Sequence, residues 1–338
     1  MEGAFKNNIK VGEWIEYYDT GEKFIIYNYS NDGLYNNTIP GLNYDVYVTF
    51  FYKNGNASVE SSILQNNEFV FNGEYRSFYT SGILKEKGRY KEGLKNGLWY
   101  EYYEDGNTLS FGDYINGTGL YSSYYNTGKI FLNGNYYEGE KNGLWTEYYI
   151  DGTVKKELTY IDGFVDINKV VTEYEETGFK LAQYYVKPSN DLDMIKDGLC
   201  IIYHPSGNVK NQGIYSDNNK DGKWLEYYEN GLQKSEVTYE KGNGFFVSYY
   251  ESGNILSKGK YSDYKKDGKW IYYYENGKKS EEFYYIDDFF NPNKKYITWY
   301  ENGYKKTEGY IIYLNKNVVY DGFYTEYYDN GIVFLEGN

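Results

Sequence analysis

A ten-residue pattern, Gly-x-Trp-x-x-Tyr-Tyr-x-x-Gly, recurs along this chain and constrains its fold more than any other feature. It is clearest at 97–106, 143–152, 222–231 and 268–277. A fixed period of this kind is typical of repeat architectures, in which each unit contacts mainly its neighbours. The last glycine of the pattern marks thirteen units, with degenerate ones at Gly55 and Gly178: Gly21, Gly55, Gly82, Gly106, Gly128, Gly152, Gly178, Gly207, Gly231, Gly253, Gly277, Gly303 and Gly331.

A longer period lies on top of the short one. Gly82 and Gly207 are 125 residues apart, as are Gly106 and Gly231, and the unit lengths recur in the same order. The sequence therefore indicates that a cassette of five hairpins was duplicated. We predict one array over 1–338, made of N-terminal repeats with a long loop, a first cassette, a second cassette and a C-terminal partial repeat: 1–72, 73–197, 198–321 and 322–338.

Each unit is predicted to be a β-hairpin. In a strand alternate side chains point to opposite faces, so Trp224, Glu226 and Tyr228 should share one face of the sheet. The glycine that ends the pattern supplies the positive φ of a tight turn. A second turn, ending at Gly143 or Gly268, should precede the next Trp strand. The predicted fold is all-β: an elongated antiparallel sheet or solenoid of stacked hairpins.

These residues resemble a known repeat. The runs 136–145 and 259–270, with their Gly-x-Tyr, Lys-Asn-Gly and Lys-Asp-Gly steps, are similar to the MORN repeat, and more closely to its bacterial antitoxin-like variant. This chain places Trp where the eukaryotic pattern usually has a second glycine. The resemblance implies hairpins stacked into a sheet, and a role in protein–protein interaction or scaffolding. Lipid binding has also been proposed for the family.

Charge limits the partners that this chain can bind. The net charge is −14 at pH 7, which argues against nucleic acid and against anionic membranes, because both require clustered Lys and Arg. A basic or neutral protein partner is favoured, although acidity that only keeps a tyrosine-rich surface soluble is the alternative. No run approaches the ~18 apolar residues of a membrane span.

Catalytic and metal chemistry is not predicted. Cys200 and His204 are the one cysteine and the one histidine of the chain. In the repeat alignment they occupy the Trp position and the second Tyr position, so a structural role is favoured over a nucleophile and its base. The turns lack a calcium-loop spacing, and the glycines are not followed by a helix that could hold phosphate. We expect no enzyme activity, no metal and no cofactor.

The candidate binding residues form an acidic ladder beside the tryptophans. Carboxylates recur two residues after the Trp position, where strand alternation places them next to aromatic rings. They could engage Lys or Arg of a partner, or they could pair with lysines on adjacent strands. The candidates are Glu101, Glu147, Glu226, Glu326, Trp99, Trp145, Trp224 and Trp270, and the wider ladder also includes Glu16 and Glu173.

Two functions are consistent with this pattern. The first is a protein-binding scaffold, similar to an antitoxin or immunity protein, that covers a basic partner. The second is a cell-surface or secreted array that binds host protein, choline or polysaccharide through aromatic pockets. The first fits a cytoplasmic protein if the chain is complete, and the second fits a chain whose export signal was removed. The loop from Ser30 to Pro40 is a candidate cap for an exposed sheet edge.

Overall fold

The structure is a computed structural model that describes residues 2–6, 9–29, 45–65, 69–188, 194–314 and 317–337. These residues form strands joined by turns, and no helix occurs among them that could span a membrane. The strands pair antiparallel and belong to one sheet that does not close on itself. The predicted all-β array of stacked hairpins is confirmed. The loop from Ser30 to Pro40, proposed as a cap, lies outside the described residues.

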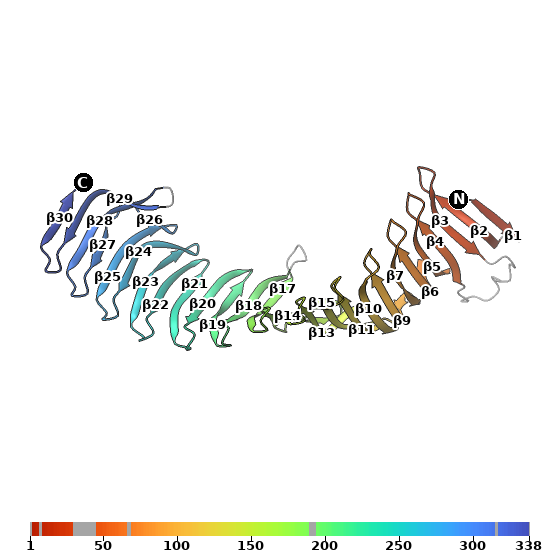
Figure 1. The fold of residues 1–338 in the computed structure, drawn as a ribbon, viewed down its shortest axis with the longest axis horizontal. Coiled ribbons are helices and arrows are strands. Elements are labelled where there is room, and N and C mark those ends of the chain that lie inside the picture. Colours follow the sequence, from red (N-terminus) through yellow and green to blue (C-terminus); the bar gives the residue numbers. More distant parts are fainter. Residues whose placement is uncertain are drawn as a thin grey trace. The chain divides into compact units, whose positions relative to one another are not determined.

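The chain divides into two compact units, Met1–Asp166 with Glu176–Gly178, and Ile167–Glu175 with Phe179–Asn338. The strands of the first unit are β1 (Glu2–Lys6), β2 (Ile9–Tyr17), β3 (Lys23–Tyr29), β4 (Asp45–Phe51), β5 (Ala57–Gln65), β6 (Phe69–Phe78), β7 (Leu84–Lys91), β8 (Leu94–Lys95), β9 (Gly97–Tyr102), β10 (Thr108–Ile115), β11 (Thr118–Tyr124), β12 (Ile130–Tyr137), β13 (Glu140–Tyr148), β14 (Val154–Ile161) and β15 (Phe164–Val165). Within this unit the strands follow one another in chain order, from red to yellow in Figure 1.

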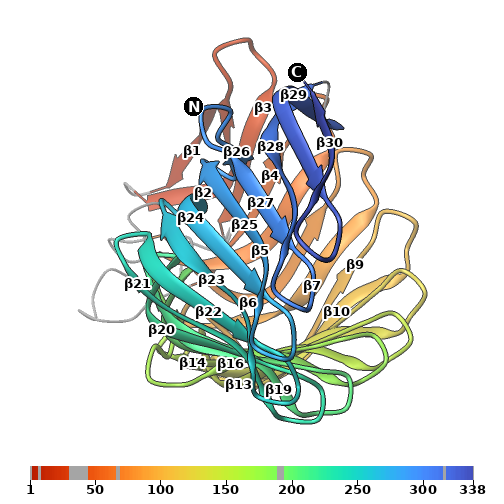
Figure 2. The ribbon, with the colours of Figure 1, turned by 90° about the vertical axis from the view of Figure 1, so that its left-hand side faces the viewer.

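The second unit repeats this arrangement. Its strands are β16 (Val171–Tyr174), β17 (Lys180–Pro188), β18 (Met194–Tyr203), β19 (Val209–Ser216), β20 (Asn219–Tyr227), β21 (Gln233–Glu240), β22 (Asn243–Tyr249), β23 (Ile255–Ser262), β24 (Lys265–Tyr273), β25 (Lys279–Ile286), β26 (Phe289–Phe290), β27 (Tyr296–Trp299), β28 (Lys305–Leu314), β29 (Asn317–Tyr327) and β30 (Val333–Gly337). Figure 2 faces this unit and shows its strands as a single layer. The cassette boundaries at 73, 198 and 322 are features of the sequence and stay a prediction.

The thirteen predicted glycine turns share one geometry. At Gly106 the φ angle is +89°, the Gly106 amide donates to Tyr103 O, and the Tyr103 amide donates to Asn107 O. Gly55 and Gly178, in the degenerate units, have φ angles of +88° and +85°. An L-residue is strained at such angles, so glycine persists there even where the rest of the pattern is lost.

The second predicted turn was misplaced. The chain reverses at two residues with positive φ, such as Glu138-Gly139 and Asp263-Tyr264, rather than at the predicted glycines. Gly143 lies inside β13, also with positive φ, at +73°. Both a type I′ turn and a β-bulge need positive φ, so glycine alone does not distinguish them.

The same correction holds in the second unit, where Gly268 lies inside β24 with a φ angle of +67°. There Lys258 pairs with Ile271 but Lys260 pairs with Asp267, so that Gly259 faces a three-residue bulge. The bulge, rather than a turn, is therefore the structural role of these glycines.

Tyrosine hydroxyls connect many of the described hairpins to the next. The second Tyr of the pattern follows the strand end, and its hydroxyl donates to the backbone carbonyl of the first Tyr position in the following unit. Tyr103, for example, donates to Tyr124 O at 2.7 Å. The other such bonds join Tyr18 to Phe51, Tyr52 to Phe78, Tyr79 to Tyr102, Tyr125 to Tyr148, Tyr228 to Tyr249, Tyr250 to Tyr273, Tyr274 to Trp299 and Tyr300 to Tyr327.

Candidate functional site

The tryptophans of the pattern are buried against glycines of the preceding strand. A Cβ built on Gly88 would lie 2.2 Å from Trp99 Cδ2, and the Trp99 indole Nε1 donates to Arg89 O at 3.0 Å. Only a residue without a side chain leaves room for the indole there. The same contact and bond recur in four further pairs: Gly3 with Trp14, Gly134 with Trp145, Gly213 with Trp224, and Gly259 with Trp270.

A lysine covers each of these indoles. Lys95 Nζ lies 4.3 Å from the centroid of the Trp99 ring, close enough for a cation–π interaction. The other pairs, at 4.3 to 4.5 Å, are Lys10 with Trp14, Lys141 with Trp145, Lys220 with Trp224, and Lys266 with Trp270. Burial lowers the pKa of Lys141 and of Lys220. The lysine always precedes its tryptophan by four residues, so the local motif is Lys-x-Gly-x-Trp.

The four tryptophans predicted as binding residues are therefore core residues. Trp99, Trp145, Trp224 and Trp270 have exposed fractions between 1% and 4%. A partner could reach the neighbouring side chains but could hardly touch the indoles themselves. Among the predicted site residues, the glutamates are the ones that remain available for binding.

Two of the predicted glutamates each pair with a lysine of the adjacent strand. Glu147 pairs with Lys155 at 2.6 Å, and Glu226 pairs with Lys234 at 2.8 Å. In both cases the lysine follows the glutamate by eight residues and lies on the adjacent strand, as the alternative interpretation of the ladder expected. Partly exposed pairs of this kind contribute about 0–1 kcal/mol each.

Glu101 differs from these two. Leu109 stands eight residues after it, where Glu226 has Lys234. Its partner is instead Lys95, at 3.6 Å, and Lys95 also pairs with Glu86 at 3.0 Å. Because Lys95 contacts both Trp99 and Glu101, the predicted placement of these two residues on one face is observed. Two carboxylates thus share one ammonium group, which leaves a local net charge of −1.

The remaining ladder residues contact tyrosines or line a hollow. The Tyr184 hydroxyl donates to Glu173 at 2.6 Å. Burial, together with the nearby Glu16 carboxylate, raises the pKa of Tyr27 to about 12. Glu326 lines a hollow of about 540 Å³ that also includes Tyr296. Within the first unit, Glu101 and Glu147 pair with different lysines, Lys95 and Lys155.

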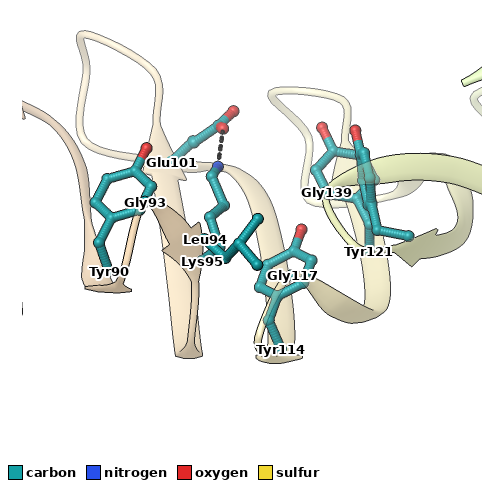
Figure 3. Close-up of a pocket in the computed structure, with 10 residues that line it drawn as sticks. Tyr90, Gly93, Leu94, Lys95, Glu101, Tyr114, Gly117, Tyr121 and Gly139 are labelled. Carbon is teal, nitrogen blue, oxygen red and sulfur yellow. Dashed lines mark ion pairs between the residues drawn. The ribbon is translucent and has the colours of Figure 1, made fainter. Parts of the chain in front are cut away.

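A pocket lies beside Glu101 in the first unit, with a volume of about 340 Å³ (Figure 3). We call it the Tyr90 pocket, and its lining residues are Tyr90, Gly93, Leu94, Lys95, Glu101, Tyr114, Gly117, Tyr121, Tyr136 and Gly139. In Figure 3 the hydroxyls of Tyr90 and Tyr114 point to the same side as the Lys95–Glu101 ion pair. Aromatic walls with a few converging polar groups are typical of a binding pocket.

Comparison with known families identifies the repeat. Eight segments match the family described as MORN repeat variant, and together they cover more than half of the chain: 10–31, 71–92, 95–116, 141–162, 196–217, 220–241, 244–263 and 266–287. The chain belongs to the MORN repeat variant family. The segment 95–116 starts at Lys95 and contains Trp99, Glu101 and Tyr114, so the MORN repeat itself supplies part of the Tyr90 pocket.

Solved structures show only a distant likeness to this MORN repeat variant. The crystal structure of TcdB2-TccC3-Cdc42 is 10% identical over 95% of this chain and 20% of that chain, with a TM-score of 0.17. The crystal structure of TcdB2-TccC3 is 11% identical over 94% and 21%, with a TM-score of 0.20. This chain thus spans about a fifth of their length. No curated protein matches it.

The tyrosines of the Tyr90 pocket stay protonated well above neutral pH. Burial raises the pKa of Tyr90 and of Tyr114, and raises that of Tyr136 to about 12. The carboxylate of Glu101 adds to the shift of each. At neutral pH this part of the MORN array therefore offers neutral phenol groups, each of which can donate one hydrogen bond.

Cys200 and His204 take the places that the repeat alignment gave them. Cys200 is fully buried, and burial raises the pKa of its thiol. His204 Nε2 lies 3.1 Å from Tyr227 O, the bond that a tyrosine makes in the other MORN units. A buried thiol with a raised pKa is a poor nucleophile. Among the described residues, no three His, Cys, Asp or Glu side chains are grouped as metal ligands would be.

Proposed function

We propose that this MORN repeat variant is a non-enzymatic scaffold that binds a basic protein partner through the acidic, aromatic surface around the Tyr90 pocket. The observation that carries the proposal is the sharing of Lys95 by Glu86 and Glu101, at 3.0 and 3.6 Å, beside an open pocket. One carboxylate charge is left over at this point and can attract a Lys or Arg of the partner.

The duplicated cassette supports the choice of this surface over the rest of the ladder. At the positions that correspond to Glu86 and Leu109, the second cassette has Asn211 and Lys234. It therefore has one carboxylate fewer and one lysine more around Glu226. The excess negative charge is a property of the first cassette and is not required by the repeat.

Binding of a basic partner would use two contributions. The net charge of −14 speeds encounter with a cationic protein, an effect that salt weakens. At contact, a partner side chain could pair with the carboxylate that Lys95 leaves unneutralised and pack on the phenol rings. A scaffold that covers the basic active surface of another protein would act as an antitoxin or immunity protein does.

Affinity capture tests the proposal. The wild-type chain on beads should retain a basic protein from a lysate of the source organism at low salt and release it at high salt. The double variant Glu86→Gln/Glu101→Gln should lose that protein. The matched control is Glu229→Gln/Glu251→Gln, which removes the same charge from two exposed turns of the second unit and should retain it. Equal retention by both double variants would contradict the proposal.

The aromatic walls of the Tyr90 pocket also favour a second candidate function, an array that binds choline or polysaccharide. Tyrosine rings beside a carboxylate can hold a quaternary ammonium group. Retention of the chain on choline or polysaccharide resin, with release by free choline or free sugar, would support this function. Empty beads in the lysate capture together with such retention would favour it over the protein scaffold.

A further inference from the structure

The lining of the Tyr90 pocket and its counterpart in the second cassette share six residues and differ at four, and one of the differing positions is that of the turn residue Gly139. Gly139 is the second residue of its two-residue turn and lines the pocket. The residue 125 positions later is Tyr264, in the same place of the equivalent turn and also with a positive φ, of +62°. One cassette therefore has no side chain at this position, and the other has a phenol ring.

The ring of Tyr264 lies among residues of its own cassette. Its centroid is 5.1 Å from that of Tyr239, and its hydroxyl donates to Lys220 O at 2.9 Å. A Cβ built on Gly242 would be 3.1 Å from Tyr264 Cε2, so the ring also covers that glycine. These contacts bury one edge of the phenol and satisfy its hydroxyl.

Those three neighbours correspond to three residues of the Tyr90 pocket. The counterparts of Tyr239, Lys220 and Gly242 in the first cassette are Tyr114, Lys95 and Gly117. In the first cassette Leu94 covers Gly117, with its Cδ2 atom 3.2 Å from a Cβ built there, and the open pocket lies beside Leu94. In the second cassette Asn219 replaces Leu94, and the Tyr264 ring covers the equivalent glycine. The duplicate shows which chemical group the surroundings accept.

We propose that the Tyr90 pocket receives a tyrosine side chain of the partner protein, which lies beside Tyr114 and Lys95 as Tyr264 lies beside Tyr239 and Lys220. This inference rests on the proposed function, because it assumes a protein partner and names the side chain that anchors it. Buried aromatic side chains of this kind commonly dominate the binding energy of an interface.

The polar groups of the pocket fit a neutral phenol. Lys95 O already accepts the Gly117 amide at 2.7 Å, and a carbonyl oxygen can accept a second hydrogen bond, here from the incoming hydroxyl. The ring would lie against Tyr114 and against Leu94, whose Cδ2 is 3.5 Å from a Cβ built on Gly139. The excess negative charge at Glu101 would repel a phosphorylated tyrosine, so the unmodified side chain is the expected ligand.

The first experiment uses p-cresol, the tyrosine side chain alone, and follows the indole N–H signals of isotope-labelled protein by NMR. In the wild type, p-cresol should shift the Trp99 signal and leave the Trp224 signal in place. Gly139→Tyr should weaken binding at least about tenfold, because the new ring fills the pocket. The control Gly152→Tyr places the same ring at another positive-φ turn glycine of the first unit, which does not line the pocket and has no atom within 4 Å of its Cβ position. It should bind as the wild type does.

The second cassette provides the reverse test. Tyr264→Gly should open a second site, so that p-cresol also shifts the Trp224 signal and the number of sites rises from one to two. This result does not depend on the folding of Gly139→Tyr. Shifts at Trp99 that are equal in the wild type and in a folded Gly139→Tyr variant would overturn the proposal. So would tighter binding of choline, cellobiose or phenyl phosphate than of p-cresol.

Capture of the partner separates this inference from the proposed function. If Gly139→Tyr loses the partner and Gly152→Tyr keeps it, the tyrosine anchor is supported. If Gly139→Tyr keeps the partner while Glu86→Gln/Glu101→Gln loses it, the anchor is wrong and the scaffold stands. If no partner is held but p-cresol binds in the predicted pattern, the phenol site stands and the scaffold fails.

Discussion

The indole of Trp99 lies so close to Gly88 that a methyl group there would overlap its Cδ2 atom, at 2.2 Å. We expect Gly88→Ala to lower the free energy of unfolding by about 2–3 kcal/mol, because the ring cannot move without leaving its site under Lys95. Urea unfolding followed by tryptophan fluorescence measures this loss.

The control separates steric overlap from backbone strain. Gly106 has a φ of +89° but no atom within 4 Å of its Cβ position, so Gly106→Ala should cost only about 1 kcal/mol. In the double variant Gly88→Ala/Trp99→Leu, the loss should be smaller than the sum of the two single losses. Additive losses, or equal losses for the two glycines, would contradict the role assigned to Gly88.

The tyrosine bonds between hairpins should each contribute modestly. Tyr103→Phe removes the donor to Tyr124 O and should lower the free energy of unfolding by about 1 kcal/mol. His204→Tyr should be neutral or stabilising, because it restores the donor used by the other units, whereas His204→Phe should destabilise. Thermal unfolding by circular dichroism compares the variants. A destabilised His204→Tyr variant would show that the His204 position differs from the other Tyr positions.

Acid should weaken the second unit through Glu282, which is only 6% exposed. Burial alone would raise the pKa of Glu282, but bonds from Lys269 and Lys279, at 2.6 and 3.2 Å, more than offset it, and the pKa lies below its ordinary value. A lowered pKa contributes stability above about pH 4.5 that is lost as the pH falls through the folded value.

Glu282→Gln tests this dependence. The variant should lose about 1–3 kcal/mol near neutral pH and should differ much less from the wild type at about pH 3. Urea midpoints across this pH range supply the comparison, with the exposed turn variant Glu275→Gln as the control. A gap between wild type and Glu282→Gln that does not change with pH would refute the prediction.

Alkaline solution should destabilise the first unit, because its buried tyrosines have raised pKa values, whereas that of Glu282 is lowered. Burial raises the pKa of Tyr90 and Tyr114, and that of Tyr136 to about 12, against an ordinary value of 10.0. The unfolded chain therefore loses these protons first, and stability should fall as the pH rises from about 10 to about 12. Urea midpoints and tyrosinate absorbance measure both effects. Midpoints that stay constant over this range would contradict the burial of these phenols.

Much of the fold could be predicted because the pattern repeats. Thirteen occurrences of one turn glycine distinguish a constraint from chance, and the turn geometry at Gly106 is the expected one. The bulge at Gly143 was missed because a turn and a bulge both place glycine at positive φ. The role of Gly88 was also missed, although a glycine eleven residues before each Trp of the pattern carried the signal.

Less of the candidate site than of the fold could be predicted from the sequence. Strand alternation correctly placed Glu101 beside Trp99, but it could not show that the indole is buried or which lysine pairs with the carboxylate. The Tyr90 pocket depends on a difference between two copies rather than on their shared pattern. Comparing Gly139 with Tyr264 at the 125-residue offset would have pointed to it, but only the structure shows that the Tyr264 ring turns inward.

The hydrogen bond from such a tyrosine to the next hairpin affects how repeat chains gain or lose whole hairpins during evolution. Hairpins that make this bond present the same hydroxyl to their successor and the same carbonyl to their predecessor, as Tyr103 and Tyr124 do. Recombination in frame could therefore insert or delete whole hairpins without leaving a donor or acceptor unmatched at the junction. Duplicating five hairpins at once would have extended the array with matched bonds at the junction, and it left a second copy whose residues could diverge, as Tyr264 does from Gly139.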